Sequence, residues 1–233
     1  MNVIVTGASK GLGKAIAARF ASENNHLFLC ARGEQALMET AAELRGMHPA
    51  ARVSARCFDL SVGQQAKDFG LWVLDTGGPV DILINNAGSF LPGNIRDEPE
   101  GLLEKMIDAN VMSAYHLTRA LLPSMMERGC GHIFNMCSIA SLQAYPNGGA
   151  YSISKFALAG FSRNLREELK PLGIKVTTIY PGAVYTDSWA GSGVDPKRIM
   201  ESRDVADMVF AAAGLSLQAN VEEIILRPLL GDL

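Results

Sequence analysis

Strand-like and helix-like segments alternate along this chain, and that alternation restricts the fold more than any other feature. Seven short apolar or β-branched runs have strand character: residues 2–5, 26–30, 52–57, 80–84, 132–136, 175–179 and 223–226. Six amphipathic segments of helical length separate most of them, at about 11–24, 33–46, 61–75, 101–128, 150–171 and 202–213. Because parallel strands joined by helices bury both faces of their sheet, the pattern predicts an α/β three-layer sandwich with a seven-stranded, mainly parallel sheet. Ligands of such sheets bind at the carboxyl ends of the strands.

The length of 233 residues is compatible with one large α/β domain or with two small ones. No internal repeat, low-complexity tract or linker rich in Pro, Gly and Ser divides the sequence, so we expect a single domain over residues 1–233. The main interruption is residues 183–200, which contain Gly191, Gly193 and Pro196 and have weak periodicity. We expect this segment to form a short substrate lid.

Composition argues against several classes of function. No apolar run approaches the roughly 18 residues of a membrane span, and the N-terminus lacks the pattern of a signal peptide, so we expect a cytoplasmic protein. The net charge of −3, with both signs mixed throughout, offers no basic stripe for nucleic acid. The four histidines are scattered, so no metal site is expected. The cysteines also lack the close spacing of a metal site and indicate reduced core residues: Cys30, Cys57, Cys130 and Cys137.

A glycine-rich turn follows the first predicted strand and leads directly into the first predicted helix. It runs from Thr6 to Gly13 with the spacing Gly-x-x-x-Gly-x-Gly, which departs from the Gly-x-Gly-x-x-Gly fingerprint. Glycines permit positive φ angles and close backbone approach, and the amides and dipole of a helix N-terminus favour an anion such as pyrophosphate. A tight turn that packs helix against sheet would need the same glycines. The residues predicted to bind a nucleotide here are Gly7, Ser9, Lys10, Gly11, Leu12 and Gly13.

The second predicted strand ends at Cys30-Ala31-Arg32, where an NAD-binding protein usually carries an acidic residue for the adenosine ribose. Arg32, with Lys10 in the turn, offers charge-assisted hydrogen bonds to a 2′-phosphate instead. We therefore expect NADP(H) to be preferred over NAD(H). The alternative is an arginine that is merely solvated after a strand.

Tyr151 and Lys155 stand four residues apart in a predicted helix, so they share one helix face. A phenol has an ordinary pKa of about 10 and a lysine one of about 10.4, so a fixed ammonium beside the phenol would lower the phenol's pKa. The pair is therefore a candidate proton donor near neutral pH. The spacing alone is weak evidence, because tyrosine and lysine fall four apart on many solvated helix faces.

Further motifs accompany these features in a fixed order along the chain. They are Asp59-Leu60 after the third predicted strand, Asn85-Asn86-Ala87-Gly88 after the fourth, then Asn110, Ser138, Tyr151-x-x-x-Lys155 and Pro181-Gly182. With the glycine turn, this series closely resembles the short-chain dehydrogenase/reductase family in its compact single-domain form, over nearly the whole chain. The resemblance implies a Rossmann-type fold and hydride transfer between a nicotinamide and a carbonyl or alcohol carbon.

The resemblance also implies which residues contact the cofactor. Asp59 and Leu60 would border the adenine, and Asn86, Ala87 and Gly88 the adenosine ribose. The nicotinamide end would contact Pro181, Gly182, Val184 and Thr186, with Tyr151 and Lys155 at its ribose. Structural alternatives exist, because Asp59 is also suited to cap the next helix, Asn85 to join two strands, and Pro181-Gly182 to end a strand.

Four residues would carry the implied reaction. Tyr151 would donate a proton to the carbonyl oxygen, Lys155 would lower the Tyr151 pKa, and Ser138 would donate a hydrogen bond to the same oxygen. Asn110 would hold a water that passes protons toward Lys155, although an amide inside a helix ordinarily points to solvent or bends the helix. Ser138 has a rival role as a hydrolase nucleophile, but it lacks the surrounding Gly-x-Ser-x-Gly and a histidine marked as its base.

The end of the chain is the best indication of substrate class. It lacks the Val-Thr-Gly and Val-Asp-Gly-Gly pattern of many 3-oxoacyl-carrier-protein reductases, and with residues 181–186 and Trp189 it is more similar to sepiapterin-reductase-like carbonyl reductases. Trp189 could stack on a flat ring such as a pterin, or plug the lid. Candidate small-molecule substrates are a pterin side-chain ketone, a dicarbonyl, a quinone or a 3-oxoacyl thioester.

Two alternatives concern activity and assembly. A non-catalytic protein that senses NADP would share the fold, but it has no need of the Ser138, Tyr151 and Lys155 set. Relatives commonly pair the helices predicted at 101–128 and 150–171, so a homodimer or homotetramer is expected. Four apolar residues of these helices would lie either in that interface or in the core: Met106, Leu117, Leu121 and Phe161.

Overall fold

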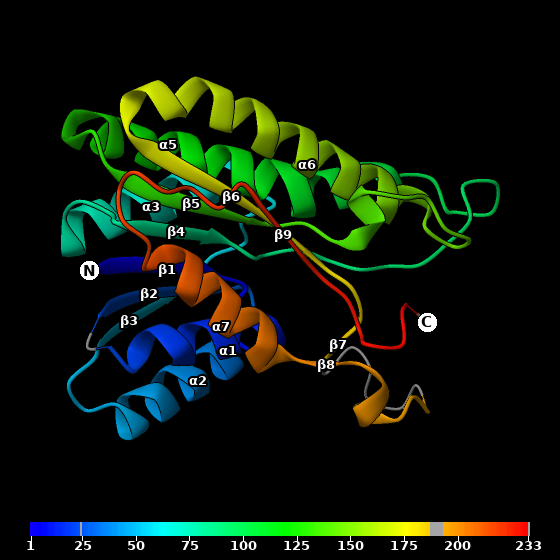
Figure 1. Ribbon diagram of the computed structural model, residues 1–233, viewed down its shortest axis with the longest axis horizontal. Helices are drawn as coiled ribbons and strands as arrows, with labels where there is room; N and C mark the ends of the chain where they lie inside the picture. The colour runs from blue at the N-terminus through cyan, green and yellow to red at the C-terminus, as the bar shows by residue number, and fades with distance from the viewer. Residues whose placement is uncertain (24, 187–192, 233) are drawn as a thin grey trace.

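The computed structural model describes residues 1–23, 25–186 and 193–232 (Figure 1). One parallel sheet has the strand order β3-β2-β1-β4-β5-β6-β9. Its strands are β1 (Asn2–Thr6), β2 (His26–Ala31), β3 (Arg52–Cys57), β4 (Ile82–Asn85), β5 (Gly131–Met136), β6 (Ile174–Pro181) and β9 (Glu223–Leu226). The single-domain α/β sandwich with a seven-stranded sheet, expected from the alternation, is confirmed.

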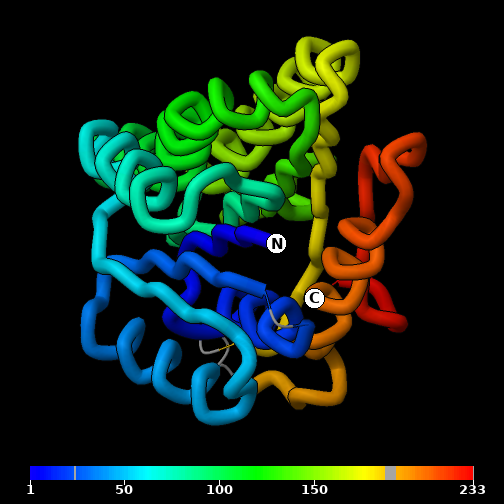
Figure 2. Tube along the Cα trace, turned by 90° about the vertical axis from the view of Figure 1, so that its left-hand side faces the viewer, coloured from blue at the N-terminus to red at the C-terminus, as the bar shows by residue number. Residues whose placement is uncertain are grey.

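Helices cover both faces of the sheet, as Figures 1 and 2 show from two directions. One face carries α1 (Gly11–Ala21), α2 (Glu34–Met47) and α7 (Ser202–Ala213), and the other carries α3 (Gly63–Gly77), α5 (Ser113–Arg128) and α6 (Gly149–Leu169). Each helix turns an apolar stripe to the sheet. Ile16 and Leu37 are fully buried under the first face, and Phe69 and Leu117 are fully buried under the second.

The single long helix expected at 101–128 is interrupted. The chain forms α4 (Leu102–Ile107), one π-helical turn (η1, Asp108–Met112) and then α5. The Ser113 N–H donates to the Asp108 carbonyl oxygen, and the Ser113 hydroxyl donates to the Ala109 carbonyl oxygen over 2.6 Å. The extra residue in this turn rotates Asn110 into the interior, where it is 1% exposed. Apolar periodicity cannot reveal such a turn, because both flanking helices keep their own periodicity.

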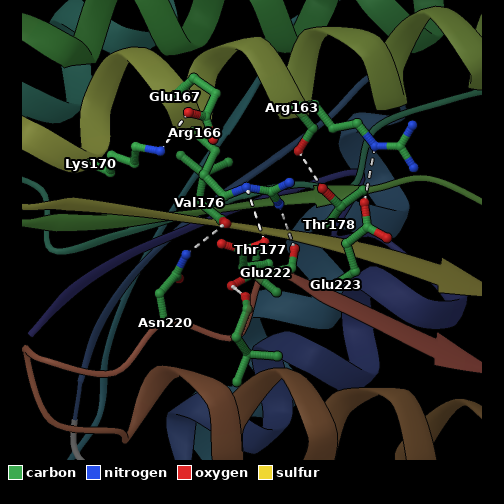
Figure 3. Close-up of polar contacts among 12 residues, drawn as sticks. Arg163, Arg166, Glu167, Lys170, Val176, Thr177, Thr178, Asn220, Glu222 and Glu223 are labelled. Carbon is green, nitrogen blue, oxygen red and sulfur yellow. Dashed lines mark hydrogen bonds and ion pairs between the residues drawn. The ribbon is translucent and has the colours of Figure 1, made fainter.

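The last strand, β9, is fastened to the sheet edge by polar contacts with α6 (Figure 3). Arg163 pairs with Glu223 over 3.0 Å, and Arg166 Nη1 donates to the Glu222 carbonyl oxygen over 3.0 Å. Glu223 Oε1 also accepts a hydrogen bond from the buried Tyr180 hydroxyl over 3.1 Å. These contacts hold the C-terminal end of the chain against β6, near the predicted nicotinamide residues.

The segment predicted as a lid is described only at its two ends. Two short strands, β7 (Val184–Tyr185) and β8 (Met200–Glu201), pair in parallel, and a 3-10 turn (η5, Pro196–Arg198) precedes β8. Trp189 lies outside the described residues, so its stacking role stays a prediction. No helix among the described residues is long and apolar enough to cross a membrane.

The four apolar residues assigned either to an interface or to the core belong to the core. Met106, Leu117 and Leu121 are fully buried. Phe161 is partly buried and packs against two of the hydrophobic clusters. They therefore give no support to an interface between copies of the chain.

Candidate active site

The glycine turn joins β1 to α1 and packs directly against the end of β4. Gly7 and Gly11 have positive φ angles of 64° and 54°, a region that favours glycine. A Cβ on Gly13 would overlap the Gly7 carbonyl oxygen and lie 2.5 Å from Asn86 Nδ2. Asn86 Nδ2 in turn donates to the Thr6 carbonyl oxygen over 2.9 Å. Close packing of the turn therefore requires these glycines and leaves its backbone open to a ligand.

A cleft of about 480 Å³ opens beside the turn, at the carboxyl ends of β1 to β4. It lies where the strand order reverses between β1 and β4, which is the usual ligand site of such sheets. The predicted cofactor residues that line it are Gly7, Ser9, Lys10, Arg32, Asp59, Leu60, Asn86, Ala87 and Gly88. The other lining residues are Cys30, Ala31, Gly33, Ala36, Phe58, Ser61, Ser89, Ala109 and Ser113. Most of these adjoin a motif residue in sequence, but Ala36 and Ser113 do not, and Ser113 lies directly after the π turn.

Arg32 and Lys10 line this cleft, and both side chains are exposed. Within residues 1–23, 25–186 and 193–232, neither side chain forms a hydrogen bond or an ion pair with another residue. Two cations that the protein itself does not neutralise, placed on neighbouring strand ends, suit a phosphate group.

The structural alternatives for Asp59 and Asn85 have different outcomes: α3 has Val62 at its N-cap without a side-chain cap, so Asp59 does not cap that helix, whereas Asn85 does join two strands. Asp59 Oδ1 accepts hydrogen bonds from the Ser61 backbone N–H over 3.1 Å and the Ser61 hydroxyl over 2.7 Å. Asn85 Nδ2 donates to Asn135 Oδ1 over 2.9 Å and to Thr118 Oγ1 over 3.0 Å, so Asn85 joins β4 to β5 and α5. Asp59 therefore shapes its own loop while it lines the cleft.

The other predicted cofactor residues lie around the cleft. Leu12 and Gly13 are in the first turn of α1, and Gly11 and Thr186 line a second, smaller cleft of about 360 Å³. Pro181 ends β6, the Gly182 N–H donates to the Leu226 carbonyl oxygen over 2.8 Å, and Val184 begins β7. The structure thus gathers them at one sheet edge but does not place them all in one cavity.

Tyr151 and Lys155 both lie near the start of α6, as their spacing predicts. Lys155 is 7% exposed, and its Nζ donates to the Met136 carbonyl oxygen over 2.8 Å. The same nitrogen lies 5.9 Å from the centroid of the Tyr151 ring. The ammonium is therefore fixed at the end of β5 with the phenol nearby.

The pKa of Tyr151 differs from the expectation drawn from its spacing to Lys155. Burial raises the Tyr151 pKa to about 12, and the opposing effect of its hydrogen bond with Ser138 is smaller. Burial also lowers the pKa of Lys155. The expected lowering of the Tyr151 pKa is not met in the chain itself, because burial deprives the phenolate of hydration and the Lys155 ammonium is bound to the Met136 carbonyl oxygen. Tyr151 is therefore protonated at neutral pH, the state that a proton donor requires.

Ser138 follows β5 and starts a 3-10 turn (η2, Ile139–Ser141). Its Oγ accepts from the Ala140 N–H over 3.2 Å, while its own N–H donates to Ser141 Oγ over 3.3 Å. These two bonds form a capping box that orients the Ser138 hydroxyl. The Ser138 hydroxyl is also near enough to the Tyr151 hydroxyl to lower the Tyr151 pKa, so the two hydroxyls lie close together.

The described residues provide no histidine bonded to Ser138 and no cluster of metal ligands. No histidine in the described part of the chain bonds to Ser138, which a hydrolase nucleophile would need. Burial raises the pKa of the neighbouring Cys137 thiol to about 12. Among the described residues, no group of three or more His, Cys, Asp or Glu could hold a metal ion.

Asn110 is buried in the π turn, and its side chain is bonded to its surroundings. Its Oδ1 accepts from the Ser89 N–H over 2.7 Å, and its Nδ2 donates to the Ser89 carbonyl oxygen over 3.1 Å and to Ser154 Oγ over 2.8 Å. Both amide hydrogens are thus used within the protein. Asn110 joins the loop after β4 to α6, beside Lys155, and any water it holds must use the backbone or the remaining Oδ1 lone pair.

The loop between β4 and α4 is also fastened to the start of α6, through residues that sequence reasoning did not find. Glu98 Oε1 accepts from the Ala150 N–H over 2.9 Å, and the Gly93 N–H donates to the Asn147 carbonyl oxygen over 3.0 Å. Gly149 has a φ of 35°, and a Cβ there would overlap Glu98 Oε1. A glycine before the Tyr-x-x-x-Lys motif is the one signal that could have indicated this contact. The contact of Glu98 with Ala150 sets the position of the helix turn that carries Tyr151.

A protein-family model described as short chain dehydrogenase matches residues 1–196 of this chain. The chain belongs to the short-chain dehydrogenase family. This short-chain dehydrogenase is 34% identical over 225 residues to an uncharacterized oxidoreductase from Staphylococcus epidermidis, covering 97% of this chain and 96% of that one. An uncharacterized oxidoreductase from Staphylococcus saprophyticus is 30% identical over 225 residues, with the same coverage.

Two solved structures that superpose on this short-chain dehydrogenase contain a cofactor. An alcohol dehydrogenase from Thermococcus sibiricus complexed with 5-hydroxy-NADP superposes with a TM-score of 0.90 at 28% identity, covering 98% of this chain and 96% of that chain. L-sorbose reductase from Gluconobacter frateurii complexed with NADPH and L-sorbose superposes with a TM-score of 0.89 at 27% identity, covering 97% and 94%. The overall fold is thus shared with solved structures that contain 5-hydroxy-NADP or NADPH.

Proposed function

We propose that this short-chain dehydrogenase is an NADP(H)-dependent oxidoreductase that reduces a carbonyl group to an alcohol. The observation that carries the proposal is the meeting of the Ser138 and Tyr151 hydroxyls, close to a buried ammonium, at the sheet edge that also holds the cleft. Two hydroxyl donors suit an oxygen that gains negative charge during reduction. The named complexes with 5-hydroxy-NADP and NADPH support the same cofactor class.

Each residue has a task in this proposal. Tyr151 delivers its proton to the carbonyl oxygen, and Ser138, oriented by Ala140, donates a hydrogen bond to the same oxygen. Lys155 stabilises the phenolate that forms when Tyr151 gives up its proton, so Lys155 acts during proton transfer. Asn110 is a positioning residue that aligns Ser89 and Ser154 around the lysine and favours a bound water.

The residues at the cleft fit NADP(H). The glycine turn leaves its backbone open at the N-terminus of α1 for the pyrophosphate, and Arg32 and Lys10 have charges free for a 2′-phosphate. Pro181, Gly182, Val184 and Thr186 would border the nicotinamide, with residues 183–200 as a lid. The chemistry that the cofactor supplies when bound is hydride donation to the carbonyl carbon.

A substrate panel tests the proposal. Purified protein is mixed with NADPH or NADH and with dicarbonyls, pterins, quinones and acetoacetyl thioesters, and loss of reduced-nucleotide absorbance is followed. We expect turnover with NADPH and at least one carbonyl class, and loss of turnover by about 10²-fold or more in Tyr151→Phe with NADPH binding retained. Tight NADPH binding without turnover on any substrate would favour a sensing protein instead. Preference for NADH would reject the assignment of Arg32.

A further inference from the structure

An aromatic ring from the loop after β4 covers part of the Tyr151 phenol. The Phe90 and Tyr151 ring centroids lie 4.8 Å apart, with an interplanar angle of 81°. Such an edge-to-face contact holds the Phe90 ring in a defined orientation. Phe90 is nevertheless 52% exposed, so the rest of its apolar surface faces outward beside the hydroxyl that we assign as proton donor.

A second aromatic side chain, Tyr145, lies in the segment that precedes α6, with the edge of its ring close to Gly148. Tyr145 is 39% exposed. Burial raises the pKa of Tyr145, so its phenol is neutral at ordinary pH. Phe90 thus contacts the Tyr151 ring directly, and Tyr145 adds a second partly exposed ring from a separate loop near the start of α6.

The two loops that carry these rings are bound to each other. The Gly93 N–H donates to the Asn147 carbonyl oxygen over 3.0 Å, and the Asn147 N–H donates to Asn94 Oδ1 over 3.2 Å. Glu98 adds the bond to Ala150 at the start of α6. The loops extend beyond the sheet at the right of Figure 1.

The two loops that carry the rings contain four charged residues, of which three have partners within the protein and the fourth is the exposed Glu100. Arg96 is the only cation of residues 86–101, and it pairs with Asp97 over 2.9 Å at the surface. Glu98 is bound to Ala150, and residues 142–148 contain no charged residue. The Tyr151 end of the site thus contrasts with the cationic end at Arg32 and Lys10, and it suits an uncharged group.

We propose that Phe90 is a specificity-determining residue whose exposed ring, together with Tyr145, binds a flat, uncharged group attached to the reacting carbonyl of the substrate. This inference rests on the proposed carbonyl reduction at Tyr151. It favours aryl or other planar conjugated ketones over small aliphatic dicarbonyls, because an aromatic surface gains most from a flat apolar partner.

Steady-state kinetics with NADPH on a matched pair of substrates test the inference. The pair is 1-phenyl-1,2-propanedione and 2,3-butanedione, which differ by a phenyl in place of a methyl group. We expect the wild type to prefer the phenyl compound in kcat/KM, and Phe90→Ala to reduce that preference about fivefold to tenfold, mainly through KM. Ile95→Ala, an exposed apolar position in the same loop, is the matched control and should leave the preference unchanged.

Each remaining outcome decides against the inference in a recognisable way. An equal loss on both diones in Phe90→Ala would mean that Phe90 only shields Tyr151 from water. A wild type that reduces both diones without preference would overturn the inference and leave the proposed function standing. Failure of the wild type to reduce any carbonyl of the panel would reject both. If Phe90→Ala is unfolded in thermal melts, Phe90→Leu, which keeps apolar volume but no ring, carries the same comparison.

Discussion

The glycine turn and the Tyr151 cluster (Asn110, Ser138, Tyr151 and Lys155) lie at the same edge of the sheet but are held in different ways. The turn depends on backbone packing and on missing side chains, and its neighbouring charges, such as Arg32, stay exposed. The cluster consists of polar side chains that are held by other protein groups, such as Lys155 on the end of β5. We therefore expect cofactor affinity to depend on the turn and turnover on the cluster. Substitutions in one region should change one property and leave the other nearly unchanged.

The largest effect is expected from Ser138→Ala, which removes one donor to the carbonyl oxygen. We expect kcat to fall about 10²-fold, as when an oxyanion donor is lost, while NADPH affinity stays nearly unchanged in fluorescence titrations. Thermal unfolding should show a cost of about 1 kcal/mol for the lost cap on η2. A parallel loss of NADPH affinity would contradict the separation of the two regions.

Arg32→Asp should have the opposite profile. We expect kcat/KM for NADPH to fall about 10- to 100-fold, because a hydrogen bond to a charged group contributes about 1.5–3 kcal/mol, while kcat at saturating NADPH changes little. Arg52→Asp is the matched control, since it makes the same charge change at the far end of β3, on an exposed residue. Equal effects in the two variants would mean that only overall charge matters.

Gly13→Ala tests whether the turn depends on close packing. The added Cβ would overlap the Gly7 carbonyl oxygen, so we expect the free energy of unfolding to fall by about 1–3 kcal/mol in urea denaturation. Gly46→Ala is the control, because Gly46 is an exposed residue of α2 with nothing within 4 Å of its Cβ position. That change should stabilise the protein by about 0.4–1 kcal/mol. Unchanged stability in Gly13→Ala would show that the turn can relax.

Glu98→Ala tests the contact between the β4–α4 loop and the start of α6. Loss of the acceptor for the Ala150 N–H should cost about 1 kcal/mol of stability and lower kcat several-fold, because the Tyr151 turn is less well placed. Glu98→Gln keeps an acceptor oxygen and should restore kcat. Glu100→Ala, an exposed change in the same loop, should have no effect. Failure of Glu98→Gln to restore kcat would shift the role of Glu98 from the hydrogen bond to its charge.

The smallest effect on turnover is expected from pH. Since the Tyr151 pKa is raised to about 12, Tyr151 stays protonated through neutral and mildly alkaline pH, and carbonyl reduction should not lose its acid there. The measurement is the phenolate absorbance of the wild type minus that of Tyr151→Phe, titrated with pH and without nucleotide. We expect the difference to appear only well above the ordinary value of about 10. A midpoint near neutral pH would show that Lys155 outweighs burial after all.

Much of the fold was accessible from the sequence, because strands buried on both faces are apolar throughout and their crossover helices keep a regular apolar stripe. Much of the lining of the cleft beside the glycine turn could also be predicted, for a related reason. Its lining comes from short motifs at strand ends, such as residues 6–13 and 85–88, and parallel strands bring those ends to one edge. By contrast, the π turn that buries Asn110 and the Glu98 contact with Ala150 join segments whose meeting no local pattern encodes.

The sequence by itself determined the order of strands and helices, the glycines of the turn and the four-residue spacing of Tyr151 and Lys155, since these depend on neighbours along the chain. Only the tertiary structure decided the direction of the Tyr151 pKa, the partners of Asn110 and the partly exposed ring of Phe90 beside the phenol. Burial, hydration and contacts between distant loops are properties of the packed molecule. Spacing can bring an ammonium near a phenol, but how much water each group has lost decides which effect prevails.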